Sequence, residues 1–100
     1  MGIIFLRSGL FDAWLKGLKD RVGKARILAR IRSAELGAFG DCAPVGEGVF
    51  EMRVHVGPGY RIYYTGRGVS LYVLLAGGDT SSQRRDISKA IAMAREIEKE

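Results

Sequence analysis

The chain has 100 residues, a length that suits one compact domain, so we predict a single domain over residues 1–100. Its composition, 47% hydrophobic and 27% charged, is that of an ordinary globular protein, and no apolar run approaches the roughly 20 residues of a membrane span. The single cysteine, Cys42, excludes an internal disulfide and a cysteine-pair metal site and fits a reducing cytosol. We therefore expect a cytoplasmic protein that uses no metal or other cofactor.

The N-terminal third is predicted to hold one short strand and two helices. Residues 3–6 read as a strand, and Ser8 is a suitable cap for the helix that follows. That helix has an apolar stripe at helical spacing, formed by Phe11, Trp14, Leu15 and Leu18. After a bend at residues 20–23, a second helix is expected to bury Ala25, Leu28, Ala29 and Ile31 and to stop at Gly37. We expect the two helices to form an antiparallel hairpin.

The net charge of +5 is unevenly placed. Between Lys16 and Arg32 the chain has seven basic residues and one acid, Asp20. Such a stripe suits a polyanion or an acidic protein partner, although a solvated helix face is the simpler interpretation. Under the nucleic-acid hypothesis, the residues predicted to contact RNA are Lys16, Lys19, Lys24, Arg26, Arg30, Arg84 and Arg85.

The rest of the chain is predicted to form a small sheet and a last helix. Residues 38–48 read as an irregular connection, and strands are expected at 49–56, 60–65 and 69–76, joined by two glycine-containing hairpin turns. The third strand is apolar on both faces, which favours a covered position in the sheet. Thr80 and Gln83 fit a capping box, and the helix that follows has a core stripe of Ile87, Ala90, Ile91, Ala94 and Ile97. This order predicts an α+β fold with a twisted, mostly antiparallel sheet packed against helices.

The first hairpin carries ionisable side chains in alternation with apolar ones. Antiparallel sheets usually keep one face on the core and one in water, and facing side chains lie roughly 5 Å apart. Arg53, His55, Arg61 and Tyr63 are therefore expected to converge on one exposed patch.

These residue types could bind and cut RNA. Two guanidinium groups make a fork for a phosphate, a histidine exchanges protons near neutral pH, and a tyrosine can stack on a base or bind a phosphate. The simpler alternatives are that Arg53 pairs with Glu51 or a cross-strand acid, that His55 is an ordinary surface residue, and that the tyrosines are ordinary strand formers.

Several strings resemble a known family. They are "FDAWLKGLKD", "KARILARIRSAELGAFGD", "PVGEGVFEMRVHVGPGYRIYY" and "LLAGGDTSSQRRDISKAI", which cover the chain from Phe11 to about Arg95. They resemble the RelE/ParE-type toxins of bacterial type II toxin–antitoxin modules, in particular the short addiction module killer proteins close to HigB.

The resemblance implies a small cytosolic RelE-like domain that acts as an endoribonuclease, cuts mRNA on the ribosome without a metal, and stops translation and growth. It implies a cognate antitoxin, which we expect to be a helix-turn-helix protein. On the matching motifs the site residues would be Arg53 and Arg61, whereas His55 and Tyr63 are added from strand geometry.

One position departs from the family pattern. Family members usually have lysine where this chain has Thr80, and a threonine cannot carry that charge. Arg84 and Arg85, one turn later, could compensate. The alternatives are a weakened, non-cleaving binding module, or a poison of DNA gyrase like the ParE branch, because the fold alone does not fix the target.

Overall fold

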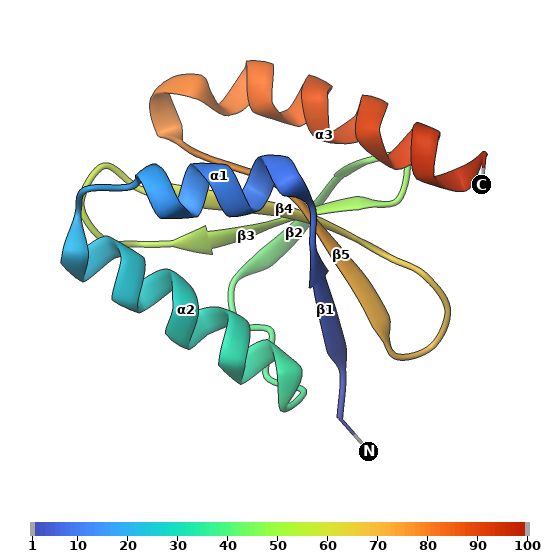
Figure 1. Cartoon of the computed structure of the whole chain (residues 1–100), viewed down its shortest axis with the longest axis horizontal. Helices are drawn as coiled ribbons and strands as arrows, with labels where there is room; N and C mark the ends of the chain where they lie inside the picture. The colour runs from blue at the N-terminus through green and yellow to red at the C-terminus, as the bar shows by residue number, and fades with distance from the viewer. Residues whose placement is uncertain (1, 100) are drawn as a thin grey trace.

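The computed structural model describes residues 2–99 and has an α+β architecture (Figure 1). In chain order the elements are β1 (Ile4–Arg7), α1 (Gly9–Gly17), α2 (Arg21–Glu35), β2 (Cys42–Gly46), β3 (Val49–Val54), β4 (Tyr60–Gly66), β5 (Leu71–Asp79), the short 3-10 helix η1 (Thr80–Ser82) and α3 (Gln83–Glu98). The strands form one sheet in the order β1-β5-β4-β3-β2. Only the β1–β5 pair is parallel, so the predicted α+β fold with a mostly antiparallel sheet is confirmed.

Helices cover both faces of this sheet. On one face, α1 and α2 contribute Phe11, Leu15, Ile27 and Ile31 to a core with the strands. On the other face, Ala90 and Ala94 of α3 pack in a second, smaller core. Much of the sheet is therefore buried on both sides, which alternation in one strand pair does not reveal.

The predicted Ser8 cap of α1 is confirmed, whereas the bend expected at residues 20–23 is wrong, because α2 begins at Arg21 with Asp20 as its N-cap. The Ser8 side chain accepts a hydrogen bond from the Phe11 amide at 3.0 Å, and Asp20 accepts one from the Gly23 amide at the start of α2, also at 3.0 Å. Asp20 also accepts a hydrogen bond from the Tyr60 hydroxyl at 2.7 Å, which ties the beginning of α2 to β4. The chain reverses between the two helices, as predicted, and they diverge as they cross the sheet (Figure 1).

The predicted buried stripe of α2 is largely wrong. Its buried hydrophobic residues are Ile27, Ile31 and Ala34, whereas Ala25, Leu28 and Ala29 are exposed. The physical reason is the contact of Gly23 with Tyr60, where a Cβ atom would come within 2.4 Å of the ring. That contact turns the Gly23 side of the helix toward the sheet, and the residues that share this side lie four, eight and eleven positions later.

Several boundaries also differ from the sequence prediction. The strand expected at residues 69–76 is β5, Leu71–Asp79, which begins two residues later and ends three residues later. The connection over residues 38–48 contains β2, an edge strand that tolerates Pro44 because an edge position leaves one side of the strand unpaired. β3 ends two residues early, because the turn at Gly57 and Gly59, both with positive φ, begins there. The capping box before α3 is formed by Asp79 and Ser82, one residue before the predicted pair.

Candidate functional site

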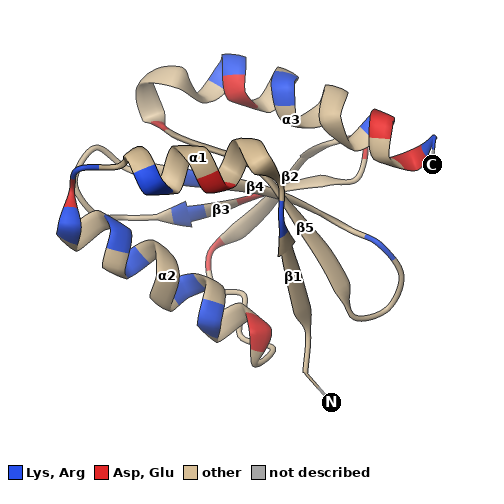
Figure 2. Ribbon diagram, viewed as in Figure 1, with Lys and Arg blue, Asp and Glu red and all other residues tan. Residues whose placement is uncertain are grey.

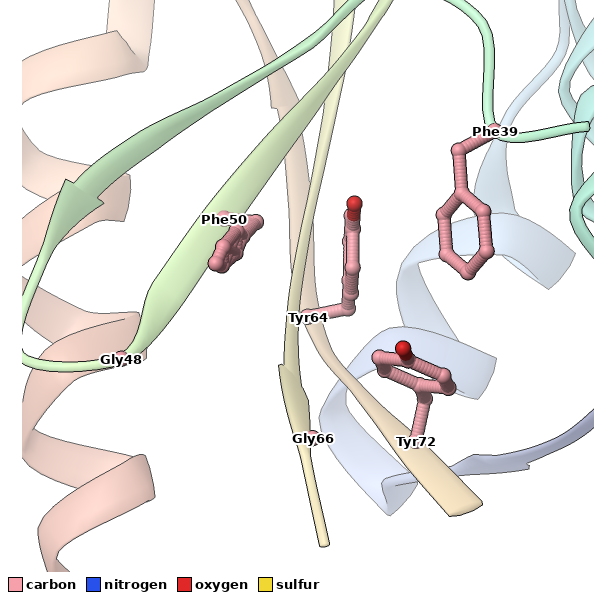
Figure 3. A pocket seen from close by; sticks show the side chains of 6 residues that line it. All are labelled: Phe39, Gly48, Phe50, Tyr64, Gly66 and Tyr72. Carbon is pink, nitrogen blue, oxygen red and sulfur yellow. The ribbon is translucent and has the colours of Figure 1, made fainter. Parts of the chain in front are cut away.

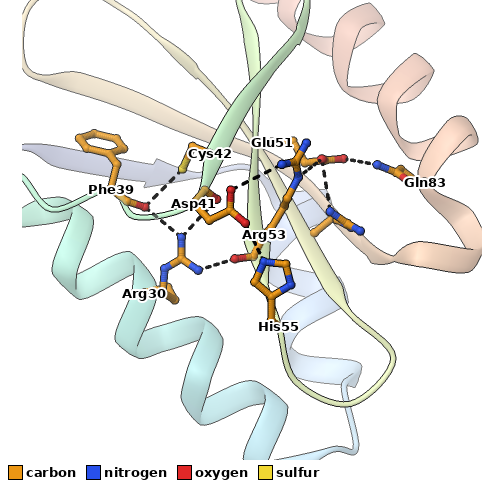
Figure 4. Close-up of polar contacts among 9 residues, drawn as sticks. Arg30, Phe39, Asp41, Cys42, Glu51, Arg53, His55 and Gln83 are labelled. Carbon is orange, nitrogen blue, oxygen red and sulfur yellow. Dashed lines mark hydrogen bonds and ion pairs between the residues drawn. The ribbon is translucent and has the colours of Figure 1, made fainter.

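The β3–β4 register brings the two predicted arginines together. Arg53 lies directly opposite Arg61, and Glu51 lies opposite Tyr63. Both guanidinium groups reach the same carboxylate oxygen. Arg53 Nε lies 3.1 Å from Glu51 Oε1 (Figure 4), and Arg61 Nη1 lies 3.5 Å from the same atom. The predicted convergence of the two arginines is therefore confirmed, and a carboxylate that sequence analysis had considered only as a simple partner joins them.

Glu51 is fully buried and accepts contacts from four side chains. Besides the two arginines, the Tyr63 hydroxyl donates to Oε2 at 3.0 Å and the Gln83 amide donates to it at 2.8 Å. Burial acts to raise the pKa of Glu51, but hydrogen bonds from Gln83, Arg53 and Tyr63 and the charge of Arg61 outweigh it, so the pKa lies below its usual value. Glu51 is thus an ionised hub that links β3, β4 and α3.

Tyr63 is not on an exposed face, contrary to the sequence prediction. Its side chain is fully buried in the core beneath α3, together with Ala90 and Leu75. Burial, followed by its hydrogen bond to Glu51, raises the pKa of the Tyr63 hydroxyl far above its ordinary range. Tyr63 can orient Glu51, but it cannot reach a ligand from this position.

The other end of this face is open. The His55 side chain is 69% exposed, and its Nε2 atom lies 2.6 Å from Oδ2 of Asp41, a residue just before β2. The hydrogen bond from His55 is the main reason that the pKa of Asp41 is lowered, and nearby Arg53 adds to it. Arg53 is 36% exposed and also lies 3.5 Å from Asp41. Sequence analysis missed Asp41 because it lies in the connection that was expected to be irregular.

Arg30 was predicted to contact RNA, but in the structure it binds backbone carbonyls. Its guanidinium donates to the carbonyl oxygens of Arg53, Phe39 and Asp41 (Figure 4). These contacts hold the segment before β2 against the end of β3. Gly40 lies against the same guanidinium, and a Cβ atom there would come within 2.7 Å of Arg30 Nη2.

Arg61 is the least satisfied polar side chain of the cluster. It is only 17% exposed, and its contact with Glu51 is an ion pair at 3.5 Å. Within residues 2–99, its Nε atom is buried and has no hydrogen-bond partner. A half-buried guanidinium with free donors is costly unless an acceptor completes it. Arg53 and Arg61 contact the Glu51 carboxylate, Arg53 also contacts the Asp41 carboxylate, and Arg30 binds the Asp41 carbonyl. These three arginines and two carboxylates together carry one net positive charge.

The remaining predicted RNA contacts lie in two separate groups. Figure 2 shows lysines and arginines along α2 and the end of α1, and a second set at the start of α3. Because α3 covers the opposite face of the sheet, the two groups do not form one stripe. None of the following forms an ion pair within the described chain: Lys16, Lys19, Lys24, Arg26, Arg84 and Arg85.

Thr80 takes a structural role at the start of η1. Its hydroxyl donates to the Gly59 carbonyl at 3.3 Å, which joins the end of β5 to the β3–β4 turn. The side chain is exposed and places no charge beside the arginines.

An apolar hollow of about 410 Å³ lies on the sheet face that α1 and α2 partly cover (Figure 3). Its walls are the rings of Phe39, Phe50, Tyr64 and Tyr72. Burial is the main cause that raises the pKa of Tyr64, and Cys42 adds to it. No charged side chain lines this hollow, so it offers shape and apolar surface and no acid or base chemistry.

Residues 2–99 contain neither a candidate metal site nor a candidate membrane-spanning helix. No group of three or more histidine, cysteine, aspartate or glutamate side chains there could hold a metal ion. In the same part of the chain, no helix has the length and apolar character needed to cross a membrane.

Comparison with known proteins identifies a relative in Haemophilus influenzae. No protein-family model matches the chain. A Haemophilus influenzae protein that is described only as an uncharacterized protein is 45% identical over 87 residues, which are 87% of this chain and 88% of that protein.

Proposed function

We propose that this chain, which belongs to one family with the Haemophilus influenzae protein, is the toxin of a toxin–antitoxin module and cuts ribosome-bound mRNA. The observation that carries the proposal is the arginine pair. Arg53 and Arg61 are adjacent across two strands, both are partly exposed, and the buried Nε of Arg61 has no partner within residues 2–99. Such a pair suits a phosphodiester, because guanidinium donors fit phosphate oxygens and stabilise charge that grows on them.

Glu51 supplies the rigidity that this task needs. Arginine side chains lose much rotamer freedom when they are ordered, so holding them in place before the ligand binds lowers the cost of binding. The buried carboxylate fixes one side of each guanidinium, and Tyr63 and Gln83 in turn fix the carboxylate. Glu51 is thus a positioning residue.

His55 is the side chain best suited to move a proton. Because the Asp41 carboxylate accepts from Nε2, the neutral ring carries its hydrogen there and leaves Nδ1 free as a base. In the proposed reaction Nδ1 takes the proton of the ribose 2′-OH, whose oxygen attacks the adjacent phosphorus. The bond from phosphorus to the 5′ oxygen breaks, and that oxygen takes a proton from solvent while His55 releases its own to solvent. The products are a 2′,3′-cyclic phosphate and a 5′-hydroxyl. Arg53 and Arg61 would stabilise the charge on the phosphorane.

The exposed cations of α1 and α2 would contact ribosomal RNA. They are free of ion pairs within residues 2–99, and their contacts to a phosphate backbone would weaken as salt rises. As partner we propose an antitoxin of the helix-turn-helix class, and as location the cytoplasm.

Mapping of mRNA 5′ ends after expression in a bacterium tests this function. Expression of the parent should produce new ends in phase with codons, and Arg61→Ala should remove them. Arg67→Ala is the matched control, because the Arg67 side chain lies in the β4–β5 turn and, within residues 2–99, hydrogen-bonds to the Ile97 carbonyl and forms no ion pair. Growth arrest that is as strong with Arg61→Ala as with the parent would refute the assignment of the arginine pair.

A second candidate is a toxin of the same fold that binds its target without cutting it, such as a poison of DNA gyrase. Thr80 favours it, because it brings no cation to the arginine pair, and so does the burial of Tyr63, which leaves His55 with few partners for proton transfer. Intact mRNA together with a DNA damage response would select this candidate.

A further inference from the structure

A hollow lies between α2 and the end of β3. Its volume is about 300 Å³, and it is lined by Arg26, Ala29, Arg30 and Ser33 from α2 and by Val54 and His55 from the end of β3. The helix residues lie three, four and seven positions after Arg26, so they share one side of α2. Arg53 directly precedes the two β3-side residues.

The groups in this hollow that remain free are donors. Arg26 is exposed and forms no ion pair within residues 2–99, and the Ser33 hydroxyl makes no hydrogen bond there. Arg30 donates its hydrogen bonds to backbone carbonyls, but its positive charge still lines the hollow. No carboxylate lines the hollow, and the nearby Asp41 is turned onto His55 and Arg53. This set of groups suits an anion.

We propose that this hollow binds a backbone phosphate of single-stranded RNA, next to the phosphate held by Arg53 and Arg61. The proposal rests on the proposed function and adds a second binding position on the strand. Its location favours a strand over a free anion, because His55 lines the hollow and shares the Asp41 carboxylate with Arg53, while Arg26 belongs to the row of cations on α2. The small side chain of Ala29 lines the hollow without filling it, and Arg26 and Ser33 supply the contacts.

The test is binding of a fluorescent 2′-O-methyl RNA hexamer, which lacks the 2′-OH and cannot be cut. Anisotropy is measured for the parent, Arg26→Gln, Ser33→Ala and the control Arg32→Gln over a series of salt concentrations. Arg32 lies on the same helix, is exposed and loses the same charge when replaced, but it does not line the hollow. Thermal melting confirms that each variant is folded.

We expect Arg26→Gln to weaken binding several-fold more than Arg32→Gln. The slope of log affinity against log salt should also become shallower by about 0.7, the amount for one lost contact to a single strand. Ser33→Ala should weaken binding less and leave the slope unchanged. A bulky replacement, Ala29→Leu, should fill the hollow and weaken binding without any change of charge.

The outcomes separate this proposal from the proposed function. If Arg26→Gln and Arg32→Gln weaken hexamer binding equally and Ala29→Leu does not affect it, the proposal that the hollow binds RNA is wrong, even if mRNA cleavage is found. The expected pattern of binding, without any mRNA cleavage, would support RNA binding by the hollow and contradict the proposed nuclease activity. If the parent protein does not bind the hexamer, the proposal that the hollow binds RNA is wrong.

Discussion

The two ends of one face of the β3–β4 hairpin have opposite environments. At one end, Glu51 and Tyr63 are fully buried beneath α3. At the other end, two residues along the same strands, Arg53 and Arg61 are partly exposed, and His55 beyond them is largely exposed. The residues alternate in the same way throughout, so the difference comes from where α3 begins and ends.

This difference shows how a small domain holds a charged surface in place. A surface arginine ordered by another surface residue gains little, because water competes for both groups. Here the partner of the arginines is a buried carboxylate whose remaining oxygen is satisfied by Tyr63 and Gln83. The buried end should therefore dominate stability, and the open end should dominate activity.

The largest effect is expected at the buried end, from Glu51→Leu. It would leave the Tyr63 hydroxyl, the Gln83 amide and the Arg61 guanidinium without their common acceptor. Removal of one member of a buried charged network typically costs about 3–5 kcal/mol, and we expect an unfolding free energy lower by about that amount in urea titration.

Glu47→Leu is the control for that variant. Glu47 also forms a two-contact pair with an arginine, Arg95, but both side chains are exposed. Its effect on the unfolding free energy should be a small fraction of that of Glu51→Leu. Similar losses for the two variants would contradict the contrast between the buried and open ends.

A smaller effect is expected for Tyr63→Phe. This change keeps the ring in the core and removes only the hydroxyl that donates to Glu51, so we expect a loss of about 1–2 kcal/mol in the same titration. Growth arrest should persist if the variant is folded, because Tyr63 cannot reach the substrate. If the folded Tyr63→Phe variant loses mRNA cleavage, Tyr63 is a catalytic residue after all.

The pH dependence of the unfolding free energy should also show the contribution of ionised Glu51. Its pKa is lower in the folded chain than its ordinary value of 4.5, so the unfolded chain binds the extra proton as pH falls below that value. The stabilisation is complete above about pH 4.5 and is lost as pH falls through the folded pKa. Parent and Glu51→Gln should therefore differ most near neutral pH and converge in acid, and a constant difference would contradict this account.

At the open end, His55→Asn should leave the unfolding free energy almost unchanged, because the His55 side chain is exposed. If His55 moves the proton of the 2′-OH, cleavage should fall by about 10²-fold or more. Cleavage at the parental rate would remove His55 from the mechanism and leave binding by the arginines as the activity of this surface.

Local patterns predicted much of the fold. The Ser8 cap, the end of α2 before Gly37, the two hairpins and the covered position of β5 follow from residue types at short spacing. The side of α2 that faces the sheet did not follow, because a contact between Gly23 and Tyr60, far apart in sequence, determines it.

The site was predicted only in part, because contacts between residues far apart in sequence also shape it. Strand alternation placed Arg53 opposite Arg61, but it could not tell that α3 covers Tyr63 or that Gln83 reaches Glu51 from that helix. The Glu51-x-Arg53 spacing was a usable signal for the ion pair, whereas nothing local pointed to Asp41 as the partner of His55.

The most direct test of the arginine pair is cleavage of a defined mRNA in a reconstituted translation system with purified ribosomes. Parent, Arg61→Ala and Arg67→Ala are compared, with the RNA ends and their 2′,3′-cyclic phosphate read out together. We predict cuts with that chemistry for the parent and Arg67→Ala, and a loss of about 10²–10³-fold for Arg61→Ala. Cuts by Arg61→Ala at the parental rate would contradict the account.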